Sequence, residues 1–131
     1  MSHPYRIGNP AFPALPVSVY QLEGSVHTEL LSALLDTGAD GSLMPEALLA
    51  SVQADRLRQV RIHSHWGETR VAMVYLVDLE VAGQRLPAVE VVADNQGEDV
   101  LLGRNVLNRL ILLLDGPTRA TDVLNRRPAR F

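Results

Sequence analysis

The sequence of 131 residues contains no cysteine and no lysine, so that all 12 of its basic residues are arginine. Without cysteine, the chain has no thiolate nucleophile, no disulfide and no zinc–thiolate site. Without lysine, it has no Schiff-base amine and no lysine to clamp phosphate in a P-loop. The catalytic chemistry that remains is that of carboxylates, hydroxyls, imidazoles or a metal.

The chain also lacks an excess of positive charge and a long hydrophobic run. Its net charge is −3 and its pI is near 5.7, which offers no broad cationic surface to a nucleic acid. Arg126, Arg127 and Arg130 crowd near the C-terminus, where a short basic segment is usually a solvated tail. No apolar run approaches the roughly 20 residues that cross a bilayer, and no signal-peptide core is visible. We therefore expect a cytoplasmic protein that binds neither nucleic acid nor membrane.

The length and the 47% hydrophobic content predict one globular domain with a real core. Four of the eight prolines fall within the first sixteen residues, at Pro4, Pro10, Pro13 and Pro16. Because each fixes φ and removes a backbone donor, residues 1–16 are predicted to be an extended arm. This arm is a disordered end, lies across a dimer, or is trimmed by proteolysis. Residues 17–124 are the predicted domain, and residues 125–131 the basic tail.

Alternating and β-branched residues dominate the pattern between residues 17 and 124. Apolar residues occupy every second position from Val71 to Val81, with Asp78 among the polar residues between them, and this predicts the longest strand. With residues 60–62 it forms a hairpin whose tip is residues 63–69. Further strands are predicted at residues 17–22, 30–35, 86–93, 99–102, 111–114 and 118–124, and helices at 45–52 and 104–110. The pattern predicts a mostly β, closed barrel with one or two short helices.

Two segments carry the strongest chemical signal. Asp36 directly follows the apolar run 30–35, and the sequence continues as Thr37 and Gly38, a hydroxyl and a residue that permits a tight turn. A carboxylate in that place is expected to be rigid and partly desolvated. The second segment, 101–105, reads LLGRN, an apolar strand that ends at Gly103 before a helix.

DTGAD at residues 36–40 together with LLGRN at 101–105 resembles the retropepsin-like aspartic proteases. This single-lobed family includes the retroviral proteases and their cellular and bacterial relatives, and the resemblance covers residues 17–114. It implies a closed acid-protease barrel that assembles as a two-fold homodimer and hydrolyses peptide or protein substrates. It implies no cofactor and no metal.

The resemblance also assigns roles by residue. Asp36 corresponds to the catalytic aspartate, and the hydroxyl of Thr37 to the group that ties the two active-site loops together across the dimer. Asp40 and Arg104 correspond to an ion pair beneath the loop. The residues implied to support the loop are Thr37, Gly38, Ala39, Asp40, Gly103 and Arg104. The residues implied to contact substrate are Gly38, Asp40, Gly41, Trp66 and Leu102.

The implied mechanism uses two aspartates, one from each chain. Two carboxylates about 3 Å apart cannot both ionise, so the pair shares one proton, activates a water and protonates the peptide carbonyl. The hairpin tip 63–69 corresponds to the flap that closes over substrate. It lacks the repeated glycines of viral flaps, and Trp66 either contacts substrate or packs within the hairpin.

Other assignments of these residues are weaker. His63, His65 and Glu68 lie close in sequence but lack a further nearby metal ligand. No G-x-S-x-G elbow surrounds Ser42 or Ser51, so the chain does not resemble a serine hydrolase. None of the other aspartates considered as a second catalytic carboxylate precedes Thr-Gly; these are Asp99, Asp115 and Asp122. The rival function is a catalytically silent module that keeps the fold for dimerisation or peptide binding. The intact Asp-Thr-Gly argues against it.

Overall fold

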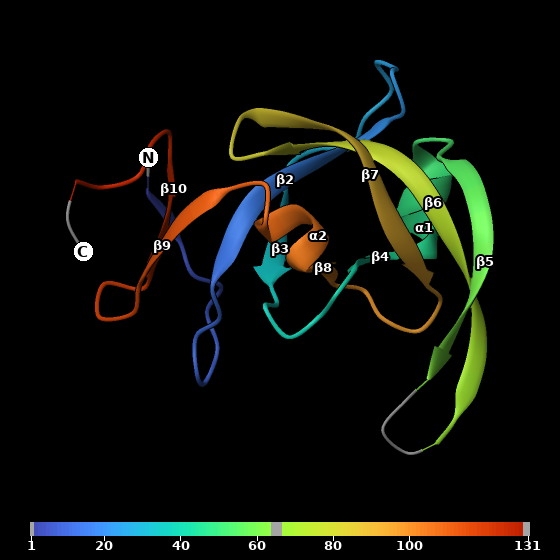
Figure 1. Ribbon diagram of the computed structural model, residues 1–131, viewed down its shortest axis with the longest axis horizontal. Helices are drawn as coiled ribbons and strands as arrows, with labels where there is room; N and C mark the ends of the chain where they lie inside the picture. The colour runs from blue at the N-terminus through green and yellow to red at the C-terminus, as the bar shows by residue number, and fades with distance from the viewer. Residues whose placement is uncertain (1, 64–66, 130–131) are drawn as a thin grey trace.

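The computed structural model describes residues 2–63 and 67–129. Its largest part is a closed sheet, in which each strand pairs with the next and the last pairs back onto the first (Figure 1). Around the ring, the strands are β2 (Ala14–Gln21), β3 (Leu31–Leu35), β8 (Val100–Leu102), β4 (Ser42–Pro45), β7 (Gln84–Asp94) and β6 (Thr69–Val81). β5 (Asp55–His63) pairs with residues 69–76 of β6, the part of that strand that β2 does not reach, and forms the predicted hairpin with it. The predicted mostly β, closed barrel is confirmed.

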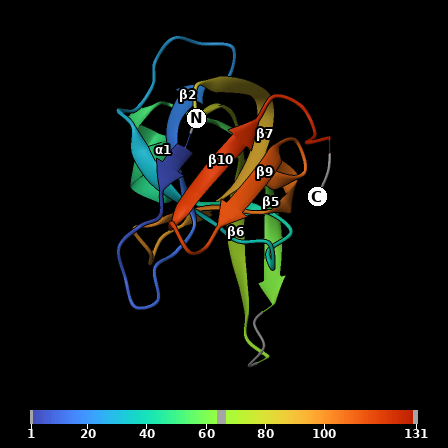
Figure 2. The ribbon, with the colours of Figure 1, turned by 90° about the vertical axis from the view of Figure 1, so that its left-hand side faces the viewer.

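A second, smaller sheet stands beside the barrel and is seen face-on in Figure 2. It consists of β1 (Ser2–Pro4), β10 (Ala120–Leu124) and β9 (Ile111–Asp115) in that order, all antiparallel. Part of the segment predicted to be an extended arm is therefore paired as β1. Sequence patterns did not indicate this pairing, because its partner β10 lies more than a hundred residues along the chain.

β2 begins at Ala14, three residues before the strand predicted from the sequence. Ala14 and Leu15 are 2% and 1% exposed and belong to the core. Pro16 lies within this strand opposite Ser32 of β3, and its carbonyl accepts a hydrogen bond from the N–H of Ala82 at 2.9 Å. The prediction that residues 14–16 belong to the arm is thus wrong, since proline disfavours a strand only where its N–H is needed.

The two helices are shorter than predicted. α1 (Glu46–Ser51) begins after Pro45, which starts helices well because its missing N–H is not needed there. α2 (Arg104–Leu107) ends early, because Arg109 and Leu110 bond three residues back, to Val106 and Leu107, instead of four. Among the described residues, no helix has the length and apolar character that crossing a membrane requires.

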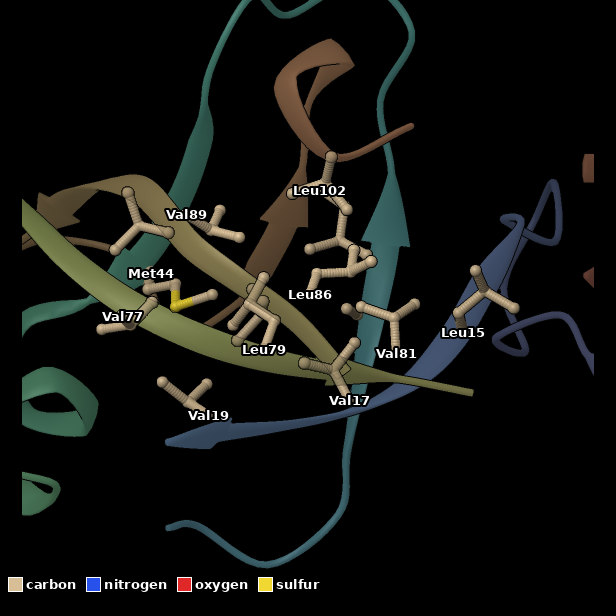
Figure 3. Close-up of a cluster of buried hydrophobic side chains, with 14 of the residues drawn as sticks. Leu15, Val17, Val19, Met44, Val77, Leu79, Val81, Leu86, Val89 and Leu102 are labelled. Carbon is tan, nitrogen blue, oxygen red and sulfur yellow. The ribbon is translucent and has the colours of Figure 1, made fainter. Parts of the chain in front are cut away.

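Side chains from opposite walls of the barrel fill its interior (Figure 3). Val77, Leu79 and Val81 point inward from β6, as their alternation predicted, and all three are 0% exposed. Asp78, on the polar side of the same strand, is nevertheless only 4% exposed. The turn after β2 and the side chain of Arg85 cover it, so a residue on the polar side of the strand is buried.

Candidate active site

The two sequence motifs meet because β3 and β8 run parallel, side by side. Ala33, Leu34 and Leu35 pair with Val100, Leu101 and Leu102. Both strands therefore end at the same edge of the barrel, where Asp36 and Gly103 follow them. The N–H of Asp36 donates to the carbonyl of Leu102 at 2.9 Å, which fixes the start of the active-site loop, residues 36–41.

Asp36 is partly buried, and its carboxylate is oriented by its own loop. The N–H of Gly38 donates to Asp36 Oδ1 at 3.0 Å, and the N–H of Ala39 reaches the Asp36 carbonyl at 3.3 Å. Within residues 2–63 and 67–129, Asp36 Oδ2 has no hydrogen-bond partner. The carboxylate thus keeps one oxygen available to a water or to another acid.

Gly103 is required by a close approach of two backbones. A Cβ at this position would lie 2.1 Å from the carbonyl oxygen of Gly41 and 2.9 Å from that of Ala39. Backbone atoms cannot yield as a flexible side chain can, so only glycine lets the start of α2 pack against the active-site loop. This contact accounts for the glycine in the second motif.

Arg104, the next residue, also binds the active-site loop. Its N–H donates to the carbonyl of Ala39 at 2.9 Å, and its guanidinium donates to the carbonyl of Thr37 at 3.2 Å. The guanidinium also forms an ion pair with Asp40. Because the Asp40 side chain is 92% exposed, the ion pair itself adds little stability, and the bonds to backbone carbonyls position the loop. The structure therefore brings the predicted loop-support residues together.

Ser42 and Asn105 also hold the loop, and sequence reasoning missed both. Ser42 Oγ donates to Asn105 Oδ1 at 2.8 Å and accepts the N–H of Gly103 at 3.0 Å, with the serine 0% exposed. Asn105 Nδ2 donates to the carbonyl of Glu90 at 2.8 Å, which ties the loop to β7. Ser42 was weighed only as a nucleophile. Its place directly after the glycine loop was the signal for a structural role.

The predicted substrate contacts do not share one environment. Gly38, Asp40 and Gly41 are exposed on the active-site loop. Leu102 is 0% exposed, and its side chain lies within the buried cluster drawn in Figure 3. Its carbonyl accepts the N–H of Asp36. The Leu102 side chain therefore faces the core, and the implied contact of Leu102 with substrate stays a prediction. Trp66 lies outside the described residues.

The alternative aspartates have structural partners. Asp99 pairs with Arg6 at 2.7 Å, and Asp115 Oδ1 accepts the N–H of Thr118 at 3.2 Å in the turn after β9. The Asp122 carboxylate accepts the hydroxyl of Ser2 across the small sheet. In these places the three aspartates stabilise the ends and pairings of strands.

The hairpin of β5 and β6 projects well beyond the barrel (Figure 1). At its described end, His63 Nδ1 lies 3.0 Å from Thr69 Oγ1. His65, one of the three residues considered for a metal, lies outside the described residues. In the parts of the chain that the structure does describe, no three histidine, aspartate or glutamate side chains gather as metal ligands do.

A closed barrel that holds an Asp-Thr-Gly loop against a Gly-Arg-Asn helix defines a single-lobed, retropepsin-like acid protease fold. The family model of the gag-polyprotein putative aspartyl protease matches residues 22–109. This chain belongs to that family. A search of curated proteins found no match.

Solved structures of aspartic proteases share the fold at low sequence identity. A retropepsin-like aspartic protease from Rickettsia conorii superposes with a TM-score of 0.65 at 12% identity, over 94% of this chain and 90% of that one. The simian foamy virus (mac) protease gives 0.54 at 23% identity, over 72% and 91%. The retroviral protease-like domain of Ddi1 from Leishmania major gives 0.55 at 22%, over 88% and 90%. At these identities, the likeness supports the fold alone.

Proposed function

We propose that the chain is an aspartic endopeptidase that acts as a homodimer, with one Asp36 from each copy in a shared active site. The observation that carries the proposal is the state of Asp36. Its loop is held rigidly by β8 and α2, while one carboxylate oxygen is left without a partner in the described residues. Membership of an aspartyl protease family supports the same chemistry.

The proposed reaction uses the two carboxyl groups as one acid–base pair. When two carboxylates approach closely, the first proton is retained, so one group is an acid while the other is a base. The base takes a proton from a water, whose oxygen attacks the peptide carbonyl carbon, and the acid gives its proton to the carbonyl oxygen. The group that took the water's proton then gives it to the nitrogen while the other carboxylate takes back a hydroxyl proton, and the C–N bond breaks to leave an amine and a carboxylic acid. The hairpin of β5 and β6 is proposed to close over the bound peptide.

The proposal requires a second copy because of the aspartates that one chain provides. It contains one Asp-Thr-Gly, and the aspartates weighed as a second carboxylate are engaged in strand ends and turns. A partner is also favoured by β9, an edge strand of the small sheet, where Leu113 and Leu114 are 49% and 47% exposed. Half-exposed leucines on an edge strand suit a surface that a second copy covers.

Replacing Asp36 by asparagine tests this proposal. Cleavage of a diverse peptide library should be lost, while the circular dichroism spectrum and the mass in solution stay as in the wild type. Asp55→Asn, an exposed carboxylate at the start of β5, is the matched control and should keep full activity. A statine-type inhibitor should block the wild-type enzyme, and activity should be greatest at mildly acidic pH, where the pair retains one proton.

Three outcomes would contradict the proposal. If Asp36→Asn cleaves as well as the wild type, Asp36 is not the catalytic acid or base. If the wild type binds peptides but cleaves none across the acidic and neutral range, the chain is the silent binding module considered above. Activity that rises steadily above neutral pH would also exclude a pair that must keep a proton.

A further inference from the structure

A cavity of about 660 Å³, here called the side cavity, lies between the barrel and the small sheet. Its walls come from three parts of the chain: the turn between β6 and β7 (residues 82–84), the segment after α2 (residues 109–111), and the small sheet, through His3 and residues 123–125. Figure 1 shows the turn 82–84 and the active-site loop, residues 36–41, at opposite ends of the barrel. The side cavity is therefore separate from the candidate active site.

Half of the residues that line the side cavity are aliphatic, namely Ala82, Leu110, Ile111, Val123 and Leu124. Leu110 and Val123 also pack against the hydrophobic core, and Leu124 pairs with Ile111 across the small sheet. These walls are thus fixed by the core and by strand pairing. Cavities of this size that combine aliphatic walls with a few polar groups are the usual form of a ligand site.

The polar side of the side cavity carries positive charge. Arg109 and His3 line it, and among the residues that the structure describes no aspartate or glutamate does. Arg126 and Arg127 follow directly on Asn125, a further lining residue, and both are exposed. This gathering of arginine occurs in a chain whose net charge is −3. The local potential therefore favours an anionic ligand.

Arg109 is held in a defined place and keeps hydrogen-bond donors. Its guanidinium donates to the carbonyl of Pro87 at 3.0 Å, and its backbone N–H donates to the carbonyl of Val106 at 2.9 Å. In the described part of the chain, the other guanidinium N–H groups have no partner. A guanidinium binds a carboxylate through two parallel hydrogen bonds, so Arg109 is suited to that group.

We propose that the side cavity binds the C-terminal carboxylate of a peptide whose last side chains are aliphatic. Arg109 bonds the carboxylate, and the aliphatic walls cover the last side chain. The amides of Gln84 and Asn125, which each donate and accept, bond the peptide groups that precede it. A free fatty acid shares the carboxylate and the apolar body but lacks these peptide groups. Binding here is independent of the proposed catalysis.

Fluorescence anisotropy with a labelled peptide tests the proposal. The probe carries its label at the N-terminus and ends in two leucines, with either a free carboxylate or an amide at the C-terminus. The full chain is used as Asp36→Asn, so that the probe is not hydrolysed. The free acid should bind at least about tenfold more tightly than the amide, because a hydrogen bond to a charged group contributes about that factor or more.

Substitutions of Arg109 show whether the carboxylate binds in the side cavity. Arg109→Gln removes the charge and the fork of donors, and should abolish the preference for the free acid. Arg119→Gln is the matched control, since it removes the same charge from an exposed arginine that lies in the turn before β10 and does not line the cavity. The control should keep the preference. Arg109→Lys, which retains the charge alone, should reduce the preference less than Arg109→Gln.

Three results would overturn the proposal. Equal affinity for the free acid and the amide would show that no carboxylate is recognised. A preference that survives Arg109→Gln would show that the carboxylate binds elsewhere. If octanoate displaces the free-acid probe as effectively as the unlabelled peptide does, the ligand is a fatty acid and not a peptide end. None of these measurements involves cleavage, so the proposed protease activity can fail or stand separately.

Discussion

Replacing Asp78 by asparagine should destabilise the fold without altering the active-site loop. Asp78 is 4% exposed, and its carboxylate accepts three hydrogen bonds. The N–H groups of Glu23 and Ala88 donate at 3.0 and 2.9 Å, and the guanidinium of Arg85 donates at 3.0 Å. The bonds join the turn after β2 to the bulged pairing of β6 with β7, far along the chain from Asp36.

The size of the effect follows from these bonds. Asparagine keeps the shape of aspartate but places an NH2 group where a carboxylate oxygen accepted donors, so one or two bonds to a charged group are lost. Hydrogen bonds to charged groups contribute roughly 1.5 to 3 kcal/mol each, so the loss of one or two of them predicts a loss of about 1.5 to 6 kcal/mol. For a chain of this length, that corresponds to a fall of roughly 5 to 22 °C in the unfolding midpoint. The charge of Arg85 adds little, because its side chain is 41% exposed.

The same carboxylate predicts how stability changes with pH. Burial by itself raises the pKa of Asp78, but hydrogen bonds from Ala88, Arg85 and Glu23 and the charge of Arg85 outweigh it, so that the pKa lies below its ordinary value of 3.8. As the pH falls through that value, the unfolded chain takes up a proton that the folded chain refuses, and stability is lost. The difference between the wild type and Asp78→Asn should be full above about pH 5 and should shrink below about pH 4.

Urea denaturation followed by circular dichroism at several pH values measures both effects. All samples need one protein concentration, because association shifts the apparent stability. Glu29→Gln, at an exposed acidic position, is the control and should stay within about 0.5 kcal/mol of the wild type. A loss below about 1 kcal/mol for Asp78→Asn, or a difference from the wild type that does not change with pH, would refute the reasoning.

Three further changes test the contacts that hold the active-site loop. Gly103→Ala forces a methyl group onto backbone atoms, and should cost about 1 to 3 kcal/mol in thermal unfolding and reduce peptide cleavage. Ser42→Ala leaves two polar partners unsatisfied, and should cost about 1 to 3 kcal/mol in urea denaturation. Asp40→Asn breaks an exposed ion pair, and should change the free energy of unfolding by less than about 1 kcal/mol, a difference that salt removes.

Each of these changes has its own control. Gly116→Ala adds a methyl group at a glycine with no atom within 4 Å of the new Cβ, and should leave stability nearly unchanged. Ser51→Ala removes an exposed hydroxyl whose one bond is to the carbonyl of Leu48. Equal midpoints for Gly103→Ala and Gly116→Ala would contradict the close backbone approach, and equal losses for the two serine variants would contradict the buried role of Ser42. Asp40→Asn is compared with wild type in high salt, where a persisting difference would show that the ion pair is not its cause.

Local patterns predicted the features that depend on neighbours in the sequence. The inward-facing alternation of β6 follows from the two-residue period of a strand, and the start of α1 from Pro45. The active-site motifs were also visible, because DTGAD and LLGRN resemble the motifs of a known family. The bonds and ion pair that join the two motifs link residues 61 to 67 positions apart.

What the patterns missed depends on segments that carry no motif. β1 finds its partner in β10, and no local signal marks either as the complement of the other. Asp78 lies on the polar side of its strand, yet the turn at Glu23 closes over it and supplies an N–H that satisfies the charge. A polar residue can be buried when a segment far along the chain supplies a hydrogen-bond donor to it. The alternation of residues along one strand does not indicate whether such a donor is present.

Asp36 is positioned by bonds to the backbone of its loop, so we expect that a substitution can remove its charge without moving it. The backbone of the active-site loop is fixed by Leu102, Arg104 and Ser42, while the carboxylate takes only the N–H of Gly38 among the described residues. Asparagine keeps an oxygen for that N–H, so Asp36→Asn removes the charge and leaves the loop in place. In the proposed mechanism, the second carboxyl group comes from the other copy and completes the acid–base pair. The proposed catalytic chemistry is therefore a property of the pair, and the association of two chains determines whether it exists.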